Sequence, residues 1–190
     1  GRGGVVEDLR FENFTMENVG TGIVVTSYYE MGGEGATAQE PVSRRTPVFR
    51  NIAISAVTIH GAAKVVDIEG LPEMPIAGLR LTDVIGSGKS GLLATYTDGL
   101  ELHDVQVNPA GGAAFSIASA SNLLLDDITA GKPVVGSPVL RMTKSPGAIV
   151  RDSRAFPGTG VFLSAGAGEL KSITLSGNAL ANAATPTEER

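Results

Sequence analysis

The stretch that decides the fold is residues 1–30, GRGGVVEDLRFENFTMENVGTGIVVTSYYE. Leu9 and Phe11 are apolar residues two positions apart, which is the spacing of a strand with one buried face. Asn13 then interrupts the alternation, because Asn accepts the left-handed backbone conformation that a sharp corner requires. Phe14 resumes the apolar pattern. This stretch therefore predicts a strand, a corner and the beginning of a second strand.

The same pattern recurs along the whole chain. Later copies begin at Ile52, Leu79, Leu100, Leu123, Ala148 and Ile173, so the successive gaps are 43, 27, 21, 23, 25 and 25 residues. Apart from the first gap, these spacings fit one structural repeat, and a strand repeat of this length is typical of a parallel β-helix. We therefore expect an all-β fold of about seven turns. The residues at the predicted corner are Asn13, Ala56, Asp83, Asp104, Asp127, Asp152 and Gly177.

The domain boundaries follow from where the pattern stops. We assign residues 1–180 to the β-helix, and the polar tail 181–190, ANAATPTEER, is expected to be disordered because it has no periodicity. Residues 30–47 form a Gly-rich insertion that accounts for the gap of 43, and such a loop is either functional or mobile. Only eight residues precede Leu9, and none could cap the first turn. We therefore expect the N-terminal end to stack on more protein or on a partner chain.

Composition excludes several classes of function. The net charge of −5 leaves no basic surface for nucleic acid, and no apolar run reaches the length of about 18 residues that a membrane span needs. There is no cysteine, and two histidines without a tight acidic cluster predict neither a metal site nor a cofactor.

Residues 1–29 resemble the segment of glycoside hydrolase family 28, the polygalacturonases and related pectin hydrolases, that follows its catalytic strands. The stretches TPVFRNI at 46–52 and GLPE with Pro75 and Ile76 are also similar to this family, and the resemblance extends to about Val107. It implies a right-handed parallel β-helix, a secreted or periplasmic location, and inverting hydrolysis of α-1,4-linked galacturonic acid. The implied partner is polygalacturonate or a related pectic oligosaccharide.

The catalytic motifs of the family, Asn-Thr-Asp, Asp-Asp, Gly-His-Gly and Arg-Ile-Lys, precede its GRGG-like stretch and are not found here in that place. The resemblance therefore implies no catalytic residue in this span and an inactive chain when it is alone. It implies a sugar contact for Tyr29, or for Tyr28 if the register slips by one. Arg44 and Arg45 have the guanidinium shape that grips carboxylates, although a solvated pair of loop charges is the alternative.

Two motif-like stretches and the two histidines are further candidates. Asp126-Asp127 and Thr97-Asp98-Gly99 look like parts of the catalytic motifs, but Asp127 occupies the corner of the repeat and Asp-Gly is a turn signal. His103 falls on the outward position before the corner, which predicts a solvated surface site, and His60 precedes Gly61 at a turn edge.

Two functions from other classes stay open. The chain could be a non-catalytic β-helix that binds acidic polysaccharide or another protein, because the faces of solenoids are good binding surfaces. It could also be a β-helical lyase, but such enzymes commonly need calcium held by clustered acids. The sequence contains no such cluster beyond the corner aspartates.

Overall fold

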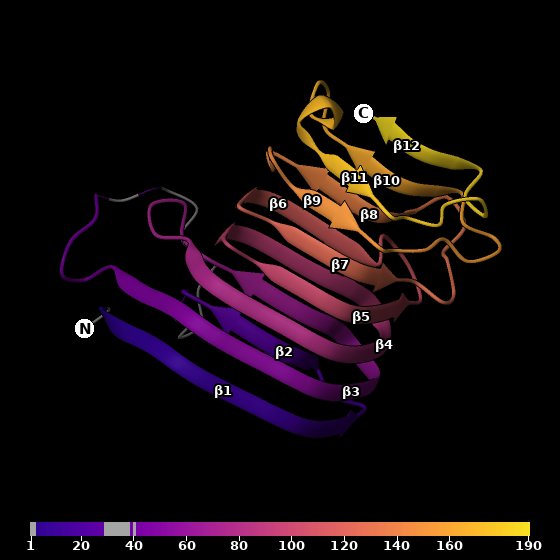
Figure 1. Ribbon diagram of the computed structural model, residues 1–190. Coiled ribbons are helices and arrows are strands. Elements are labelled where there is room, and N and C mark those ends of the chain that lie inside the picture. Colours follow the sequence, from indigo (N-terminus) through magenta and orange to yellow (C-terminus); the bar gives the residue numbers. More distant parts are fainter. Residues whose placement is uncertain (1–2, 29–38, 40) are drawn as a thin grey trace.

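The computed structural model describes residues 3–28, 39 and 41–190, which form a right-handed parallel β-helix of about six turns (Figure 1). One short 3-10 helix, η1 (Leu170–Ser172), interrupts the strands near the C-terminal end. In chain order the strands are β1 (Gly4–Glu17), β2 (Thr21–Thr26), β3 (Pro47–Glu69), β4 (Ile76–Asp98), β5 (Glu101–Pro109), β6 (Phe115–Ser121), β7 (Leu124–Thr129), β8 (Pro138–Thr143), β9 (Ile149–Arg151), β10 (Val161–Ala165), β11 (Thr174–Ser176) and β12 (Thr185–Glu189).

All copies of the sequence pattern lie in one column of parallel strands, which we call the first column. It runs through β1, β3, β4, β5, β7, β9 and β11, and Leu9 pairs with Ile52, which pairs with Leu79. The second column contains β2, the later parts of β3 and β4, and then β6, β8, β10 and β12. The predicted parallel β-helix is confirmed. The structure has about six turns, one fewer than the seven that the seven copies of the pattern predicted.

The predicted corner residues occupy left-handed backbone conformations throughout. Their φ angles lie between 51° and 65°, a region that Asn and Asp tolerate better than most side chains. Ala56 has no polar side chain to compensate for this conformation, yet its φ is 52°. The turn-residue interpretation is therefore confirmed at Asn13, Ala56, Asp83, Asp104, Asp127, Asp152 and Gly177.

The core is a continuous stack of apolar side chains inside the solenoid. Leu79, Leu81 and Val84 in β4 point inward and are fully buried, while Arg80 between them points outward. Each inward side chain packs on its equivalents in the turns before and after, because neighbouring strands of the ladder are in register. Burial of this stack is the main stabilising term of the fold.

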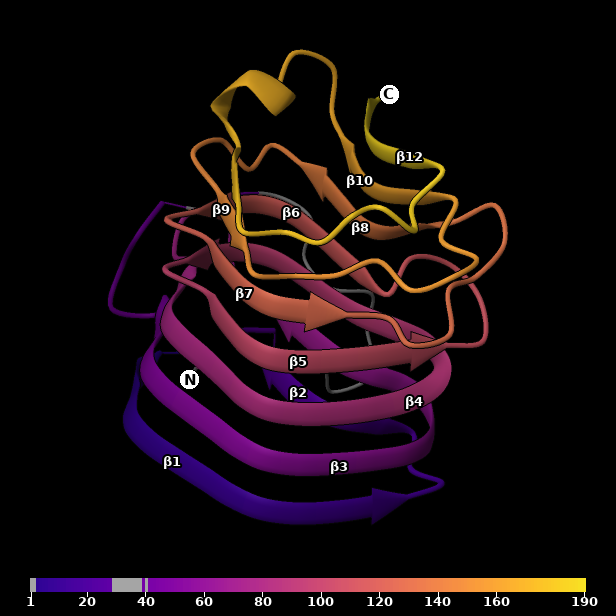
Figure 2. The ribbon, with the colours of Figure 1, turned by 45° about the vertical axis from the view of Figure 1, so that its right-hand side comes forward.

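The first turn departs from this arrangement. β1 lies at one end of the stack and pairs with β3 alone among the described strands (Figure 2). Leu9 is 38% exposed, whereas Leu79 at the same register position is 0% exposed. Phe11 and Phe14, the other apolar residues of the first copy, are also exposed. The first turn therefore presents an apolar row and an unpaired strand edge.

The expectation of a disordered tail is wrong for residues 185–189, half of the tail 181–190. Thr185–Glu189 forms β12, which adds to β10 in parallel at the C-terminal end of the stack (Figure 1). The edge of β10 supplies a template for hydrogen bonds, so the tail needs no apolar periodicity of its own. Pro186 is tolerated because β12 is the last strand, where a missing N–H breaks no further ladder.

Candidate functional site

Tyr28 lies two residues after the end of β2, close to the start of the insertion. It is half-buried, and its backbone N–H donates a hydrogen bond of 3.1 Å to Thr26 Oγ1. Tyr29, which is the residue that the family resemblance favoured for a sugar contact, lies outside the described residues.

Two glutamates and a second tyrosine surround Tyr28, and we call Tyr28, Glu69, Glu73 and Tyr96 the strand-end cluster. Thr26, Glu69 and Thr95 are paired across β2, β3 and β4, which brings the ends of these strands together. Burial raises the pKa of the Tyr28 phenol, and the negative charge of Glu69 raises it further, followed by Tyr96 and Glu73. Tyr28 therefore keeps its proton and can donate a hydrogen bond.

The same region contains buried polar atoms that lack a partner. Ser27 Oγ and Glu73 Oε2 are buried, and the described residues supply neither with a hydrogen bond. A buried polar atom without a hydrogen bond is costly, so each favours binding of a water molecule or of a ligand hydroxyl. Ser27, beside the strand-end cluster, and Glu73 within it could therefore each form a hydrogen bond with a polar ligand.

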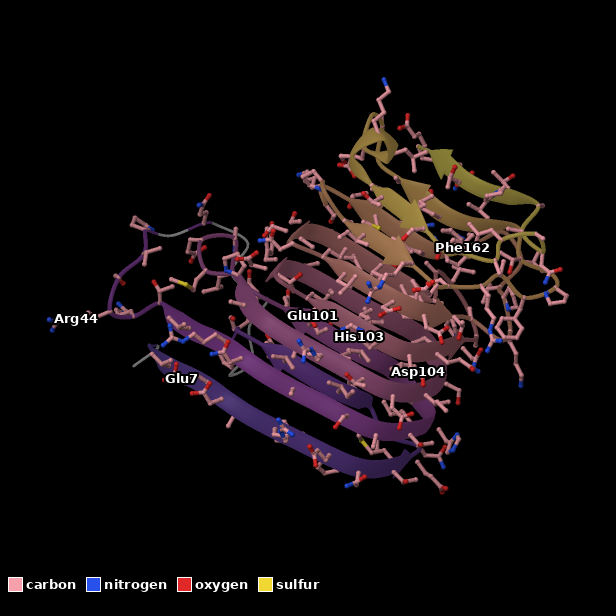
Figure 3. All side chains as sticks on the ribbon, viewed as in Figure 1. Glu7, Arg44, Glu101, His103, Asp104 and Phe162 are labelled. Atoms are coloured by element: carbon pink, nitrogen blue, oxygen red, sulfur yellow. The ribbon has the colours of Figure 1, made fainter. Side chains whose placement is uncertain are left out.

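A second group of polar residues crosses the turns on the outer face of the first column, and we call it the charged row: Arg80, Glu101, His103, Asp126 and Arg151. Arg80 Nε donates to Glu101 Oε2 at 2.7 Å, and Arg151 Nη2 donates to Asp126 Oδ2 at 2.7 Å. His103 lies between the two acids, with Nε2 3.1 Å from Glu101 Oε2 and Nδ1 3.2 Å from Asp126 Oδ2. Figure 3 shows Glu101 and His103 side by side along β5.

Both acids of the charged row are ionised at neutral pH. Hydrogen bonds from Arg80 first, and then from His103, hold the pKa of Glu101 below its usual value. The hydrogen bond from Arg151, assisted by His103, likewise lowers the pKa of Asp126. Inverting hydrolysis of a glycoside needs one carboxylic acid that keeps its proton, in addition to a carboxylate base. This pair is therefore better suited to linking turns than to catalysis.

The structure corrects the description of His103 as a simple solvated residue. Its side chain points outward as predicted, but it is only 27% exposed because it is held between two carboxylates. The sequence did contain the signal, since the register that aligns Thr82, His103 and Asp126 follows directly from the repeat. His60 is exposed and precedes Gly61, whose φ is 69°, as expected of a turn edge.

The aspartates that look like catalytic motifs have structural partners. Asp98 Oδ1 accepts hydrogen bonds of 2.7 Å from both Ser121 Oγ and Asn122 Nδ2 in the next turn. Asp127 occupies a corner with φ of 51°. The structural interpretation of these two residues is therefore supported by their geometry.

Arg44 and Arg45 lie in a turn immediately before β3 and are exposed. In that turn Ser43 N–H donates to Thr46 Oγ1 at 2.9 Å, which fixes the backbone between them. Figure 3 shows the Arg44 side chain extending away from the strands. Among the described residues, the groups that act on Tyr28 are Glu69, Tyr96 and Glu73, and Tyr29 lies outside the described residues. The sugar-binding role of Tyr28, Tyr29, Arg44 and Arg45 therefore stays a prediction.

The charged row and the strand-end cluster are the two polar groups on which a function can be built. Among the residues that the structure describes, no group of three or more His, Asp or Glu side chains could hold a metal ion. In that same part of the chain, no helix has the length and apolarity of a membrane span. No protein-family model, no curated protein and no solved structure matches this chain.

Proposed function

We propose that this chain is the C-terminal part of a polygalacturonase-like pectin hydrolase, and that it contributes sugar contacts rather than catalytic groups. The parent enzyme would hydrolyse α-1,4-galacturonosyl bonds with inversion, in the secreted or periplasmic location where pectin is met. The catalytic carboxylates would lie on preceding turns. The resemblance of residues 1–107 to that family supports the proposal, and the β-helix agrees with it.

The observation that carries the proposal is the open first turn. The apolar row of Leu9, Phe11 and Phe14 is in register with the buried core residues of β3, but it is exposed at the end of the stack. Among the described strands, β1 has a hydrogen-bonding partner on one edge only. An edge of this kind invites pairing with another strand, and solenoids normally cover it. A preceding turn of the same enzyme would bury the row and pair the edge; a stacked partner chain is the alternative.

Within this proposal Tyr28 is the sugar contact. Its phenol keeps a proton to donate, and an aromatic ring can pack on the apolar face of a sugar. Glu69 and Glu73 would repel the carboxylate of a galacturonate unit, so the strand-end cluster would address its hydroxyl groups. The exposed guanidinium groups of Arg44 and Arg45 would meet the carboxylates of the polymer.

A non-catalytic β-helix that binds acidic polysaccharide or another protein is the second candidate. The charged row agrees with it, because Glu101 and Asp126 are both ionised and each is paired with an arginine. An upstream reading frame that encodes the missing Asn-Thr-Asp, Asp-Asp and Gly-His-Gly motifs favours the hydrolase. An upstream sequence without them favours the binding module.

The proposal is tested by affinity electrophoresis in polygalacturonate together with an assay of reducing-end release. The wild-type chain is expected to bind the polymer without cleaving it. Tyr28→Ala should weaken binding by about tenfold, the effect of losing one well-placed contact. Val24→Ala is the matched control, because it truncates an exposed side chain on β2, the strand that precedes Tyr28, and should leave binding unchanged.

Two results contradict the proposal. A wild-type chain that does not bind polygalacturonate would remove the sugar-binding role altogether. Release of reducing ends by the chain alone would show that catalytic groups are present in this span. Loss of that release in Asp98→Asn or Asp127→Asn would then identify the aspartates that the geometry assigns to structure.

A further inference from the structure

A hollow of about 290 Å³ lies on the outer face of the first column, over β3, β4 and β5. Asn51, Gly78 and Gly99 line it on one side; they form a second corner of the turn, five residues before the corner at Ala56, Asp83 and Asp104. The outward positions Ala53, Arg80 and Glu101 line it on the other. Tyr28 belongs to the second column, so the hollow is a different feature from the strand-end cluster.

Small residues at two register positions create the hollow, with Ala53 at one of them and Gly78 and Gly99 at the other. Ala53 lies between Arg10 and Arg80 in the ladder, so a short side chain stands where its neighbours are long. Gly78 and Gly99 follow Asn51 at the corner in successive turns and have φ angles of 60° and 68°. A Cβ added at Gly99 would meet only the backbone of Gly78, at 3.7 Å or more, so the space beside it is open.

The rim of the hollow offers a donor beside an acceptor. Arg80 uses its Nε atom to reach Glu101 Oε2, which leaves its two terminal amino groups for another partner. His103 Nε2 contacts the same oxygen. Neither of these two contacts uses Glu101 Oε1, which can therefore accept a hydrogen bond from a ligand. The Arg80 side chain is 58% exposed and therefore accessible to a ligand. Neighbouring hydroxyl groups on a sugar ring match a donor and an acceptor placed side by side.

We propose that this hollow is a subsite for one pyranose ring of a polysaccharide. The ring would place its C–H face on Ala53, and two adjacent hydroxyls would bridge Arg80 and Glu101. This inference rests on the proposed sugar-binding function and deepens it, because it locates a sugar contact on the outer face of the first column. Acidic and neutral sugars share the C–H face and the ring hydroxyls that this subsite would bind. The experiment below therefore compares an acidic with a neutral oligomer.

The test is isothermal titration of the full chain with two ligands, a galacturonate oligomer and a neutral galactose oligomer. Ala53→Gln fills the hollow and should weaken binding by about tenfold. Ser55→Gln is the matched control, because it introduces the same side chain at the next outward position of β3, outside the hollow. Arg80→Gln should also weaken binding by about tenfold, whereas Arg10→Gln, at an equivalent register position in the first turn, should not.

Each outcome decides the question, provided that circular dichroism shows the variants to be folded. Equal losses for both oligomers support recognition of the ring hydroxyls, and a loss confined to galacturonate supports the subsite with an acidic sugar as its ligand. Unchanged affinity in Ala53→Gln, with Tyr28→Ala still weakened, overturns the subsite and leaves the proposed function standing. A wild-type chain that binds neither oligomer and does not bind polygalacturonate overturns both.

Discussion

The first turn and the central turns carry the same sequence pattern but differ in burial. Leu9 in β1 and Leu79 in β4 occupy the same register position, with Ile52 between them. Leu79 is fully buried because strands lie on both sides of it, whereas Leu9 has a described neighbour on one side only and is 38% exposed. The pattern therefore specifies which way a side chain points, and the stacking of turns determines whether it is buried.

The difference in burial between the first and the central turns also indicates that packing between neighbouring turns stabilises the fold. In a solenoid each turn contacts only its neighbours, so a terminal turn loses about half of the interface that a central turn has. The exposed row of β1 lacks that half of its packing in the described chain. We therefore expect the same substitution to have unequal effects in the two regions, and the predictions below test this from the largest effect to the smallest.

The largest contrast is expected between Leu79→Ala and Leu9→Ala. Leu79→Ala should lower the free energy of unfolding by about 2–5 kcal/mol, because it leaves a cavity in a packed core. Leu9→Ala should cost less than about 1.5 kcal/mol, since its side chain is partly in water. Urea unfolding of both variants measures the difference. Equal costs would mean that the first turn is covered in solution, for example by a second copy.

A smaller effect is expected at the corners, where the second turn and a central turn differ in residue type. Ala56 and Asp104 have φ angles of 52° and 51°, but only Asp104 has a side chain that favours this conformation. Ala56→Gly should raise the free energy of unfolding by about 0.5–1 kcal/mol, since glycine adopts the left-handed region without strain. Asp104→Ala should lower it by a similar amount. A decrease on Ala56→Gly in thermal unfolding would contradict this account of the corner.

The smallest effect is a dependence on pH that belongs to the central turns. The folded-state pKa values of Glu101 and Asp126 lie below the ordinary values of 4.5 and 3.8, because their carboxylates are paired. The unfolded chain therefore takes up these protons first, so the stabilisation is present above the ordinary values and is lost as pH falls through the lowered ones. Urea midpoints measured from neutral to acidic pH should fall less steeply in Asp126→Asn than in the wild type.

Glu12→Gln provides the control for that experiment in the first turn. Glu12 pairs with Arg10 at 3.3 Å, but both side chains are largely solvated, and exposed pairs of this kind contribute little. The slope of stability against pH should therefore be that of the wild type. If Asp126→Asn and Glu12→Gln had the same slope, the charged row would not be a special feature of the central turns.

The sequence was sufficient to predict the parallel ladder, its corners and its outward row, because each depends on a local pattern. The alternation at Leu79 and Leu81 and the turn residue at Asp83 carry that information directly. It was insufficient for β12, whose order comes from the edge of β10 rather than from any periodicity in its own residues.

The candidate sites were harder to predict than the fold. The strand-end cluster joins Tyr28 to Glu73 and Tyr96, which are distant in sequence and lie outside the repeated pattern. Part of the hollow could have been predicted, since Gly78 and Gly99 stand where Asn51 stands in the turn before them. Its depth, however, depends on the short side chain of Ala53. Such sites arise where the repeat is broken, so the repeat itself does not reveal them.

The central claim, that the first turn is an open end of a solenoid, is tested most directly by hydrogen–deuterium exchange read by mass spectrometry. Peptides that cover Gly4–Glu17 should exchange much faster than peptides that cover Ile76–Asp98, because β1 has one unpaired edge and a partly solvated core row. Equal protection of the two regions, in a chain shown to be monomeric by sedimentation, would contradict the claim.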